Sequence, residues 1–300
     1  MPESQAKVLR ATGLIIFSSL GFGSLSTLTL LTEHAGLPLL PAMLWRYLVA
    51  FLIVLLLFRG NATAIDPKRA FQLMIVGGVG QALITYLSLK ALDYLPVGPL
   101  AFLFYTYPAW VAVLSAIAGK EKLTVRRVLA LAIAMIGITV MVGAPGKEHL
   151  NRTGVLLALG IAFVYALYLP ALHKVQSGIK PEIATLYLLA GVMLSFLFTS
   201  VVTEGISFPH SLEQWKYVLM LSIICTVVAF STLIAGLRVL GPVRTSIIST
   251  IEPFFTAVLG VLVLDQPFAR ATIAGGALVA IAVVILQLAG AAPEADAARL

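Results

Sequence analysis

Charged residues are scarce in this chain. They make up 11% of its 300 residues, whereas 60% of the residues are hydrophobic. Ordinary soluble domains carry about 25% charged residues. A soluble domain of this length cannot hide so much apolar surface from water. The composition therefore excludes a soluble globular protein and predicts an integral membrane protein, with the lipid bilayer as its solvent.

Cysteines, histidines and deeply placed carboxylates are also few. The single cysteine, Cys225, lies inside an apolar run, which excludes a disulfide framework and a cysteine metal cluster. Glu252 is the only carboxylate deep in a predicted helix, so no carboxylate pair is available for catalysis. We therefore expect neither an enzyme nor a bound metal or cofactor. No histidine has a second one at metal-ligand spacing, and all lie in or beside predicted loops: His34, His149, His173 and His210.

The formal net charge of +7 does not indicate nucleic-acid binding. The basic residues lie in short segments between apolar runs, as in membrane proteins. Nucleic-acid binding would need a groove-sized basic patch beside stacking aromatic residues. We expect a small-molecule substrate and the lipid bilayer as partners and no nucleic acid. Whether the chain acts as a monomer or as a weak dimer stays open at this point.

Ten apolar segments follow one another along the chain, most of them near the length of about 20 residues that crosses a bilayer as a helix. They are too long and too uniformly apolar for the alternating strands of a membrane barrel. The predicted fold class is therefore all-α integral membrane with ten transmembrane helices. The segments are residues 9–31, 39–58, 70–91, 97–118, 128–142, 154–172, 183–202, 215–236, 243–264 and 271–288.

Lysine and arginine are distributed unevenly between the two ends of these segments. Fourteen lie on the side that holds both termini and five on the other side, while Arg46 lies within a segment. Because basic residues favour the cytoplasmic side, we expect both termini to be cytoplasmic. The fourteen are Lys7, Arg10, Arg59, Lys68, Arg69, Lys120, Lys122, Arg126, Arg127, Lys174, Lys180, Arg238, Arg244 and Arg299, and the five are Lys90, Lys147, Arg152, Lys216 and Arg270.

The two halves of the chain carry similar markers in the same order. Five spans in each half is an odd number, so the second half enters the membrane from the opposite face. We predict two inverted five-helix repeats, at residues 1–146 and 147–300, with a substrate site near the membrane midplane between them. The paired markers are Pro108 and Pro253, Ala112-Val-Leu114 and Ala257-Val-Leu259, and Glu121 and Asp265.

An ordered set of short motifs resembles the EamA-type family of the drug/metabolite transporter superfamily over nearly the whole chain. The resemblance implies an exporter in the bacterial cytoplasmic membrane for amino acids, other metabolites or drug-like molecules. On length and aromatic content, the sequence is most similar to amino-acid exporters of the YddG type. The motifs are Leu44-Trp-Arg46, Ala91-Leu-Asp-Tyr-Leu-Pro96, Gly119-Lys-Glu121, Leu237-Arg-Val-Leu-Gly-Pro242, Ile251-Glu-Pro253 and Leu264-Asp265, where the family often has glutamate in place of Asp265.

Polar residues at helical spacing mark one face of the ninth segment. Thr245, Ser249, Glu252 and Thr256 follow one another at intervals of four, three and four residues. A charge near the bilayer centre costs roughly 3 kcal/mol or more unless it meets water or a partner, so Glu252 predicts a substrate cavity. The hydroxyl residues have an alternative role, because they can bond back to their own helix or join neighbouring helices.

The repeat places an aromatic counterpart opposite Glu252. Tyr107 precedes Pro108 in the fourth segment as Glu252 precedes Pro253 in the ninth. Trp110 lies within about 60° of Tyr107 on a helix, whereas Tyr105 lies about 160° away and is predicted to point elsewhere. A half-polar, half-aromatic cavity suits a solute with an apolar side and a polar head. Simple packing is the alternative role for either aromatic residue.

The two prolines also predict irregular helices. Pro108 and Pro253 lack the N–H that a helix uses, so each leaves a carbonyl without its helical partner. Such carbonyls are tolerated at membrane depth beside a cavity or another partner. We expect kinks that let the fourth and ninth helices cross and that act as hinges.

Further cavity candidates lie on other segments. Gln81 and Thr85 share a face of the third segment, and Tyr165 lies on the sixth. Arg46 is the second charge within a membrane segment. It either extends to the membrane interface, binds a substrate carboxylate or pairs with Glu252.

These features predict a transporter of small organic solutes, most of all amino acids including aromatic ones, that works by alternating access at a central midplane cavity. A drug or quaternary-amine exporter of the same superfamily is the alternative. A solute channel is the competitor from another class, although no filter-like loop or ring of charges is visible.

Overall fold

The computed structural model describes residues 3–58, 65–95, 97–119, 124–142, 151–203, 206–265 and 270–289. Within these residues all regular structure is helical and no strand occurs. The helices are α1 (Glu3–Gly23), α2 (Leu25–His34), α3 (Leu39–Phe58), α4 (Pro67–Leu92), α5 (Val97–Phe104), α6 (Tyr107–Ile117), α7 (Val125–Val142), α8 (Arg152–Val175), α9 (Pro181–Thr203), α10 (Leu212–Ser222), the π-helix η1 (Ile223–Val228), α11 (Ala229–Ser249), α12 (Glu252–Leu264) and α13 (Arg270–Ala289).

The all-helical membrane fold is confirmed. Six helical stretches in the described part of the chain are long and apolar enough to cross a bilayer, and shorter apolar helices accompany them. Nine of the ten predicted segments lie on one helix or on two consecutive helices, and the eighth covers α10, η1 and the first part of α11. The count of ten spans stays a prediction, because several segments are divided into pieces. The six stretches are Gln5–His34, Leu39–Phe58, Pro67–Ser88, Arg152–Val175, Pro181–Thr203 and Leu212–Ser249.

Breaks divide the fourth and ninth segments at matching places. The fourth is α5 followed by α6, and the second residue of α6 is Pro108. In the ninth, α11 ends at Ser249 and α12 begins at Glu252, with Pro253 again in second place. A proline is tolerated in the first turn of a helix, where its missing N–H would have no partner. Each proline therefore begins a new helix instead of bending a continuous one.

A further break separates the eighth and ninth segments. Gly241 has a φ of 74° inside α11 and precedes Pro242. That left-handed conformation is open to glycine at little cost. The chain therefore turns between two helical stretches at this point without a long connecting loop.

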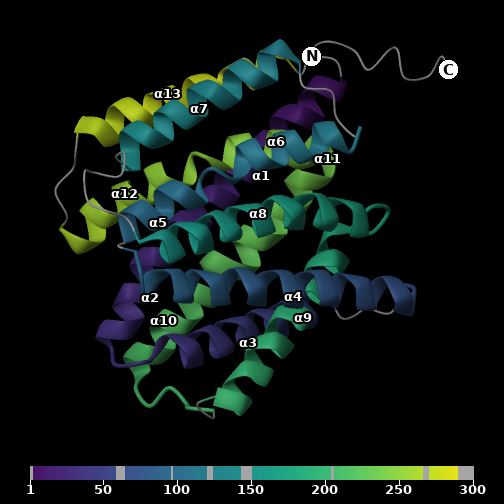
Figure 1. Ribbon diagram of the computed structural model, residues 1–300. Coiled ribbons are helices and arrows are strands. Elements are labelled where there is room, and N and C mark those ends of the chain that lie inside the picture. The colour runs from purple at the N-terminus through teal and green to yellow at the C-terminus, as the bar shows by residue number, and fades with distance from the viewer. Residues whose placement is uncertain are drawn as a thin grey trace.

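The helices lie side by side in a bundle (Figure 1). The pair α7 and α13 forms one side of it, and α3 and α9 lie on the other side. Small residues let some pairs approach closely, as in many membrane bundles. A methyl group on Gly78 of α4 would lie 2.6 Å from the carbonyl oxygen of Gly191 of α9.

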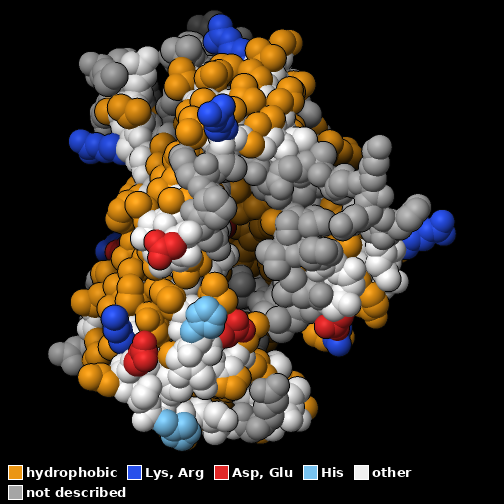
Figure 2. Space-filling model, turned by 90° about the vertical axis from the view of Figure 1, so that its left-hand side faces the viewer, with side chains coloured by type: hydrophobic (Ala, Val, Ile, Leu, Met, Phe, Trp, Pro, Cys, Tyr) orange, Lys and Arg blue, Asp and Glu red, His pale blue; other side chains and the backbone are white. Residues whose placement is uncertain are grey.

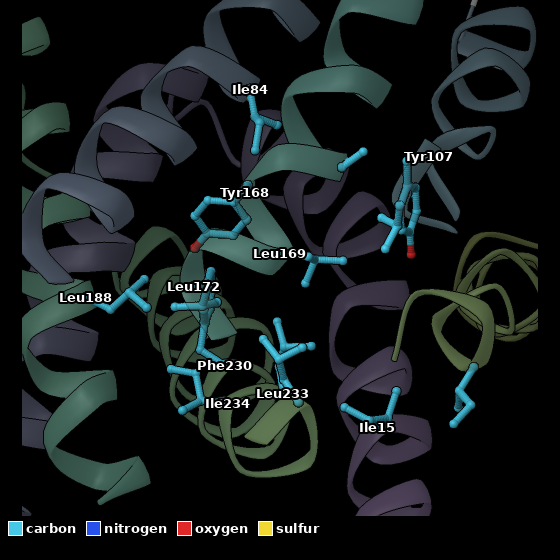
Figure 3. Close-up of a cluster of buried hydrophobic side chains, with 14 of the residues drawn as sticks. Ile15, Ile84, Tyr107, Tyr168, Leu169, Leu172, Leu188, Phe230, Leu233 and Ile234 are labelled. Atoms are coloured by element: carbon cyan, nitrogen blue, oxygen red, sulfur yellow. The ribbon is translucent and has the colours of Figure 1, made fainter. Parts of the chain in front are cut away.

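Apolar residues fill the inside and also cover the outside. The main buried cluster includes Leu169 and Leu172 of α8 and Leu233 of α11 (Figure 3). Outside, Ile117 is 78% exposed and Leu262 is 73% exposed. Figure 2 shows hydrophobic side chains over much of one face, with few charged ones between them. Such a surface is suited to lipid contact.

Candidate substrate-binding site

An aromatic cluster lies at the break between α5 and α6. It consists of Phe104, Tyr105, Tyr107, Tyr165 and Tyr168. The ring centroids of Tyr107 and Tyr165 are 4.7 Å apart, and those of Phe104 and Tyr107 are 5.3 Å apart. Tyr107 is only 2% exposed. The structure thus brings together Tyr107 and Tyr165, which the sequence predicted on separate segments.

Glu252 lies beside this cluster. The Tyr105 hydroxyl is within hydrogen-bonding reach of its carboxylate. Tyr107 and Tyr165 are close enough to experience the charge of Glu252. The first residue of α12 therefore presents one carboxylate to three tyrosines of the first and second halves of the chain.

The prediction that Tyr105 points away from Tyr107 is wrong. Their ring centroids are 6.5 Å apart, and Tyr105 is buried. The prediction assumed a continuous helix with 100° per residue. Because α5 ends at Phe104, Tyr105 and Thr106 form a turn, and both tyrosines reach the same site.

The polar residues of the ninth segment are divided between α11 and α12 and have different partners. Thr256 donates a hydrogen bond of 3.2 Å to the carbonyl of Glu252. This is a bond to its own helix, which the sequence offered as the alternative to a cavity role. Ser249 lies within hydrogen-bonding reach of the Tyr107 hydroxyl. The Thr245 hydroxyl is fully buried and has no hydrogen-bond partner within the described part of the chain.

Arg46 is held in the interior by the π-helix η1. It is only 2% exposed, so it does not extend to the membrane interface. Its Nε donates to the Thr226 hydroxyl at 2.6 Å, and its Nη2 donates to the carbonyl of Cys225 at 2.9 Å. In return, the Ser222 hydroxyl donates to the Arg46 carbonyl at 2.9 Å. No ion pair joins Arg46 to Glu252 in the region that the structure describes.

Both charged groups nevertheless act on one residue, Cys225. The Cys225 thiol is within electrostatic range of Arg46 and of Glu252. The Ser24 hydroxyl, at the break between α1 and α2, lies 3.1 Å from the Cys225 sulfur. A methyl group on Gly23 would lie 3.1 Å from the Glu252 carbonyl oxygen. One anionic and one cationic group therefore both lie within electrostatic range of Cys225, which belongs to the π-helix and contacts the break between α1 and α2.

The sequence did not identify Cys225, Thr226 or Ser222 as part of this site. Their contribution depends on η1, in which a wider helical turn changes the backbone hydrogen bonding. Serine and threonine four residues apart in an apolar run were the only signal, and they equally mark ordinary helix contacts.

Three other predicted residues, Trp110, Gln81 and Thr85, are not members of the aromatic cluster. Trp110 is 38% exposed and packs edge-on against Phe163, with 5.9 Å between the ring centroids. Gln81 and Thr85 are half-buried on α4, next to Gly80, which lies against the Tyr168 ring. Trp110 therefore lies on the outer surface of the bundle.

Comparison with known proteins assigns this chain to a family. A model of the EamA-like transporter family matches the chain twice, at residues 9–143 and 152–288. The chain belongs to the EamA-like transporter family. It is therefore a multi-pass membrane transporter, and transport rather than catalysis is the activity to be explained. The two matches divide the chain near the boundary predicted between its halves.

Individual relatives agree with this family. The chain is 24% identical over 233 residues to the uncharacterized transporter YetK of Bacillus subtilis, covering 74% of this chain and 70% of the relative. It is 23% identical over 274 residues to an uncharacterized transporter of Synechocystis, covering 87% and 82% of the two chains. A solved crystal structure, 19% identical, matches with a TM-score of 0.80 over 94% of this chain and 97% of that one, which shows the fold alone.

Proposed function

We propose that this EamA-family transporter carries small zwitterionic solutes, most of all amino acids including aromatic ones, by alternating access. The observation that supports this substrate class most strongly is the presence of a half-buried carboxylate, Glu252, and a buried guanidinium, Arg46, both within electrostatic range of Cys225. Isolated charges inside a membrane protein are costly and mark substrate or ion pathways.

The two groups complement the two ends of an amino acid. Glu252 offers a carboxylate to an ammonium group. Arg46 uses one N–H each on Thr226, Cys225 and the sulfur of Met43, which is a weak acceptor at 3.6 Å. A guanidinium has five N–H groups, and its two terminal nitrogens match a carboxylate in a two-pronged geometry. A substrate carboxylate would therefore replace only the weak hydrogen bond from Arg46 to the Met43 sulfur.

The aromatic cluster supplies the apolar part of the proposed site. Edge-to-face contacts such as that between Tyr107 and Tyr165 show how a further ring could be packed beside Glu252. The resemblance to exporters of the YddG type supports amino acids as substrates and export as the direction.

The transport cycle we propose uses two inverted five-helix halves with ten spans in total. The two family matches support the division into halves, and the matched breaks before Pro108 and Pro253 support a pseudo-symmetric relation between them. Rocking of the halves about these breaks would open the site to one side of the bacterial cytoplasmic membrane at a time. The excess of basic residues at one end supports cytoplasmic termini.

A second substrate class, the quaternary amines, is favoured by one specific observation. Glu252 lies among aromatic rings, and a carboxylate within aromatic walls suits a permanent cation. Such a substrate would bind Glu252 but has no carboxylate to bind Arg46.

The test is uptake by purified protein in liposomes, with labelled amino acids and quaternary amines compared side by side. We expect uptake of zwitterionic amino acids above that of empty vesicles. Unlabelled amino acid inside the vesicles should accelerate entry of the labelled one, as a carrier does and a pore does not. Uptake of quaternary amines alone would reject the zwitterion proposal, and the absence of acceleration would favour a channel.

A further inference from the structure

A groove with a basic end and an apolar end runs between α4 and α8. A cavity of about 510 Å³ lies at its basic end, and a second of about 240 Å³ continues it. The two cavities share Ile75, Val76 and Ala171, so they form one continuous groove. In Figure 1 the beginning of α4 and the end of α8 lie at the same end of the bundle.

Basic side chains surround the entrance. Arg69 and Lys174 are both exposed and line the larger cavity. Arg69 donates through Nη1 to the Ser177 carbonyl at 3.2 Å, which holds the guanidinium at the entrance. An adjoining cavity of about 440 Å³ adds Lys180 and one acidic residue, Asp66. The side chains that line these two cavities thus carry three positive charges, on Arg69, Lys174 and Lys180, and one negative charge, on Asp66.

The far end is apolar. Val79, Val164 and Leu167 line it, together with the ring of Tyr168. Gly80 allows that ring to lie against α4, because a methyl group there would be 2.5 Å from it. Ile75 is 46% exposed and Val79 is 58% exposed, and both lie on the outward face of α4. The groove is therefore open toward the surface that lipid covers.

The length of the groove fits one lipid chain. Arg69 and Gly80 are separated by a helical rise of about 16 Å at 1.5 Å per residue. This is about half the thickness of a bilayer core of roughly 30 Å, which is the depth of one leaflet.

We propose that this groove binds one anionic phospholipid, with its phosphate at Arg69 and Lys174 and an acyl chain along α4 and α8. Basic pockets between membrane helices are known to suit anionic headgroups. A free phosphate would use only the entrance and leave the apolar end without a role. A lipid with a neutral headgroup would gain little from the excess of positive charge.

The proposed lipid would also connect the two halves of the transporter. Arg69 belongs to the first family match and Lys174 to the second. A ligand that contacts both halves stabilises the conformation in which the two contacts are made together. This proposal does not depend on the identity of the transported solute.

The experiment measures displacement of fluorescent dioleoyl phosphatidylglycerol from the full-length protein in mild detergent. Unlabelled dioleoyl phosphatidylglycerol should displace it, whereas dioleoyl phosphatidylcholine should be at least about tenfold weaker and inorganic phosphate should have no effect. Equal displacement by the two lipids, or displacement by phosphate, would overturn the proposal.

Variants locate the site. The double variant Arg69→Gln with Lys174→Gln should bind the labelled lipid about thirtyfold more weakly. Ala171→Phe, which fills the shared part of the groove, should also weaken binding. Lys68→Gln is the matched control, because Lys68 is exposed on the same turn but lines none of these cavities. If Lys68→Gln weakened lipid binding as much as the double variant does, the lipid would be attracted by surface charge in general and not bound at a specific site.

Discussion

Glu252 and Arg46 are single residues whose chemistry depends on where the backbone places them. Glu252 begins α12, directly after the break that follows Ser249. Arg46 lies in the middle of α3 and receives its partners from η1, so its charge is compensated by a hydroxyl and a carbonyl and not by an acid. Among the described residues, neither group forms an ion pair with a side chain of opposite charge.

Removal of the Glu252 charge should abolish most of the transport. Glu252→Gln keeps the size and the hydrogen bonding of the side chain but cannot attract an ammonium group. We expect correct membrane insertion and amino-acid uptake reduced by about tenfold or more. Glu33→Gln, at an exposed residue of α2, is the control and should transport at the parent rate. Parent-rate uptake by Glu252→Gln would leave Glu252 with only a structural role.

The geometry of Arg46 should matter as well as its charge. Lysine keeps the positive charge but has a single terminal nitrogen, so it cannot bind a carboxylate in the two-pronged geometry of a guanidinium that is also held by Thr226 and Cys225. Arg46→Lys should raise the substrate concentration for half-maximal uptake by about tenfold. Thr226→Ser retains the hydroxyl acceptor and should stay close to the parent value. Equal losses in both variants would contradict a specific role for the guanidinium.

At the scale of helices, close packing depends on a few glycines. Gly191 of α9 faces the backbone of Met74 in α4, and its missing side chain lets the two helices touch. This contact joins an element of the first half to one of the second.

A methyl group at this contact should loosen the bundle. Gly191→Ala would overlap the Met74 backbone, and we expect a loss of about 1–3 kcal/mol, seen as a lower unfolding temperature in detergent. Gly160 of α8 has no atom within 4 Å of an added methyl group. Gly160→Ala is therefore the control and should be neutral or slightly stabilising. A Gly191→Ala protein as stable as the parent would show that the helices can separate without cost.

The sequence predicts the helices better than it predicts the breaks. The sequence predicts the second segment at residues 39–58 and α3 spans Leu39–Phe58, because Pro38 precedes the apolar run and Arg59-Gly60 follows it in the sequence. Pro108 and Pro253 indicated irregular helices, but no pattern showed that Tyr105 would turn toward Tyr107. One acceptor of Arg46 on η1 is the backbone carbonyl of Cys225, and a residue's type does not indicate whether its backbone carbonyl will accept such a bond.

For the molecule as a whole, orientation follows from the distribution of basic residues. We expect both termini to be cytoplasmic, which puts His34 outside and Ser177 inside. In a Cys225→Ala background, His34→Cys should react with a membrane-impermeant thiol reagent in intact cells. Ser177→Cys should react only after permeabilisation. Both positions are exposed. Labelling of Ser177→Cys in intact cells would mean that the orientation is the opposite one or that the predicted topology is wrong.

The central claim is that one site recognises both ends of a zwitterion. It is tested most directly by uptake into liposomes of three forms of one aromatic amino acid: the free acid, its carboxamide and its N-acetyl derivative. We expect the free acid to enter, and each derivative to enter about tenfold more slowly, because the carboxamide loses Arg46 as a partner and the acetylated form loses Glu252. Equal uptake of the free acid and both derivatives would contradict the claim.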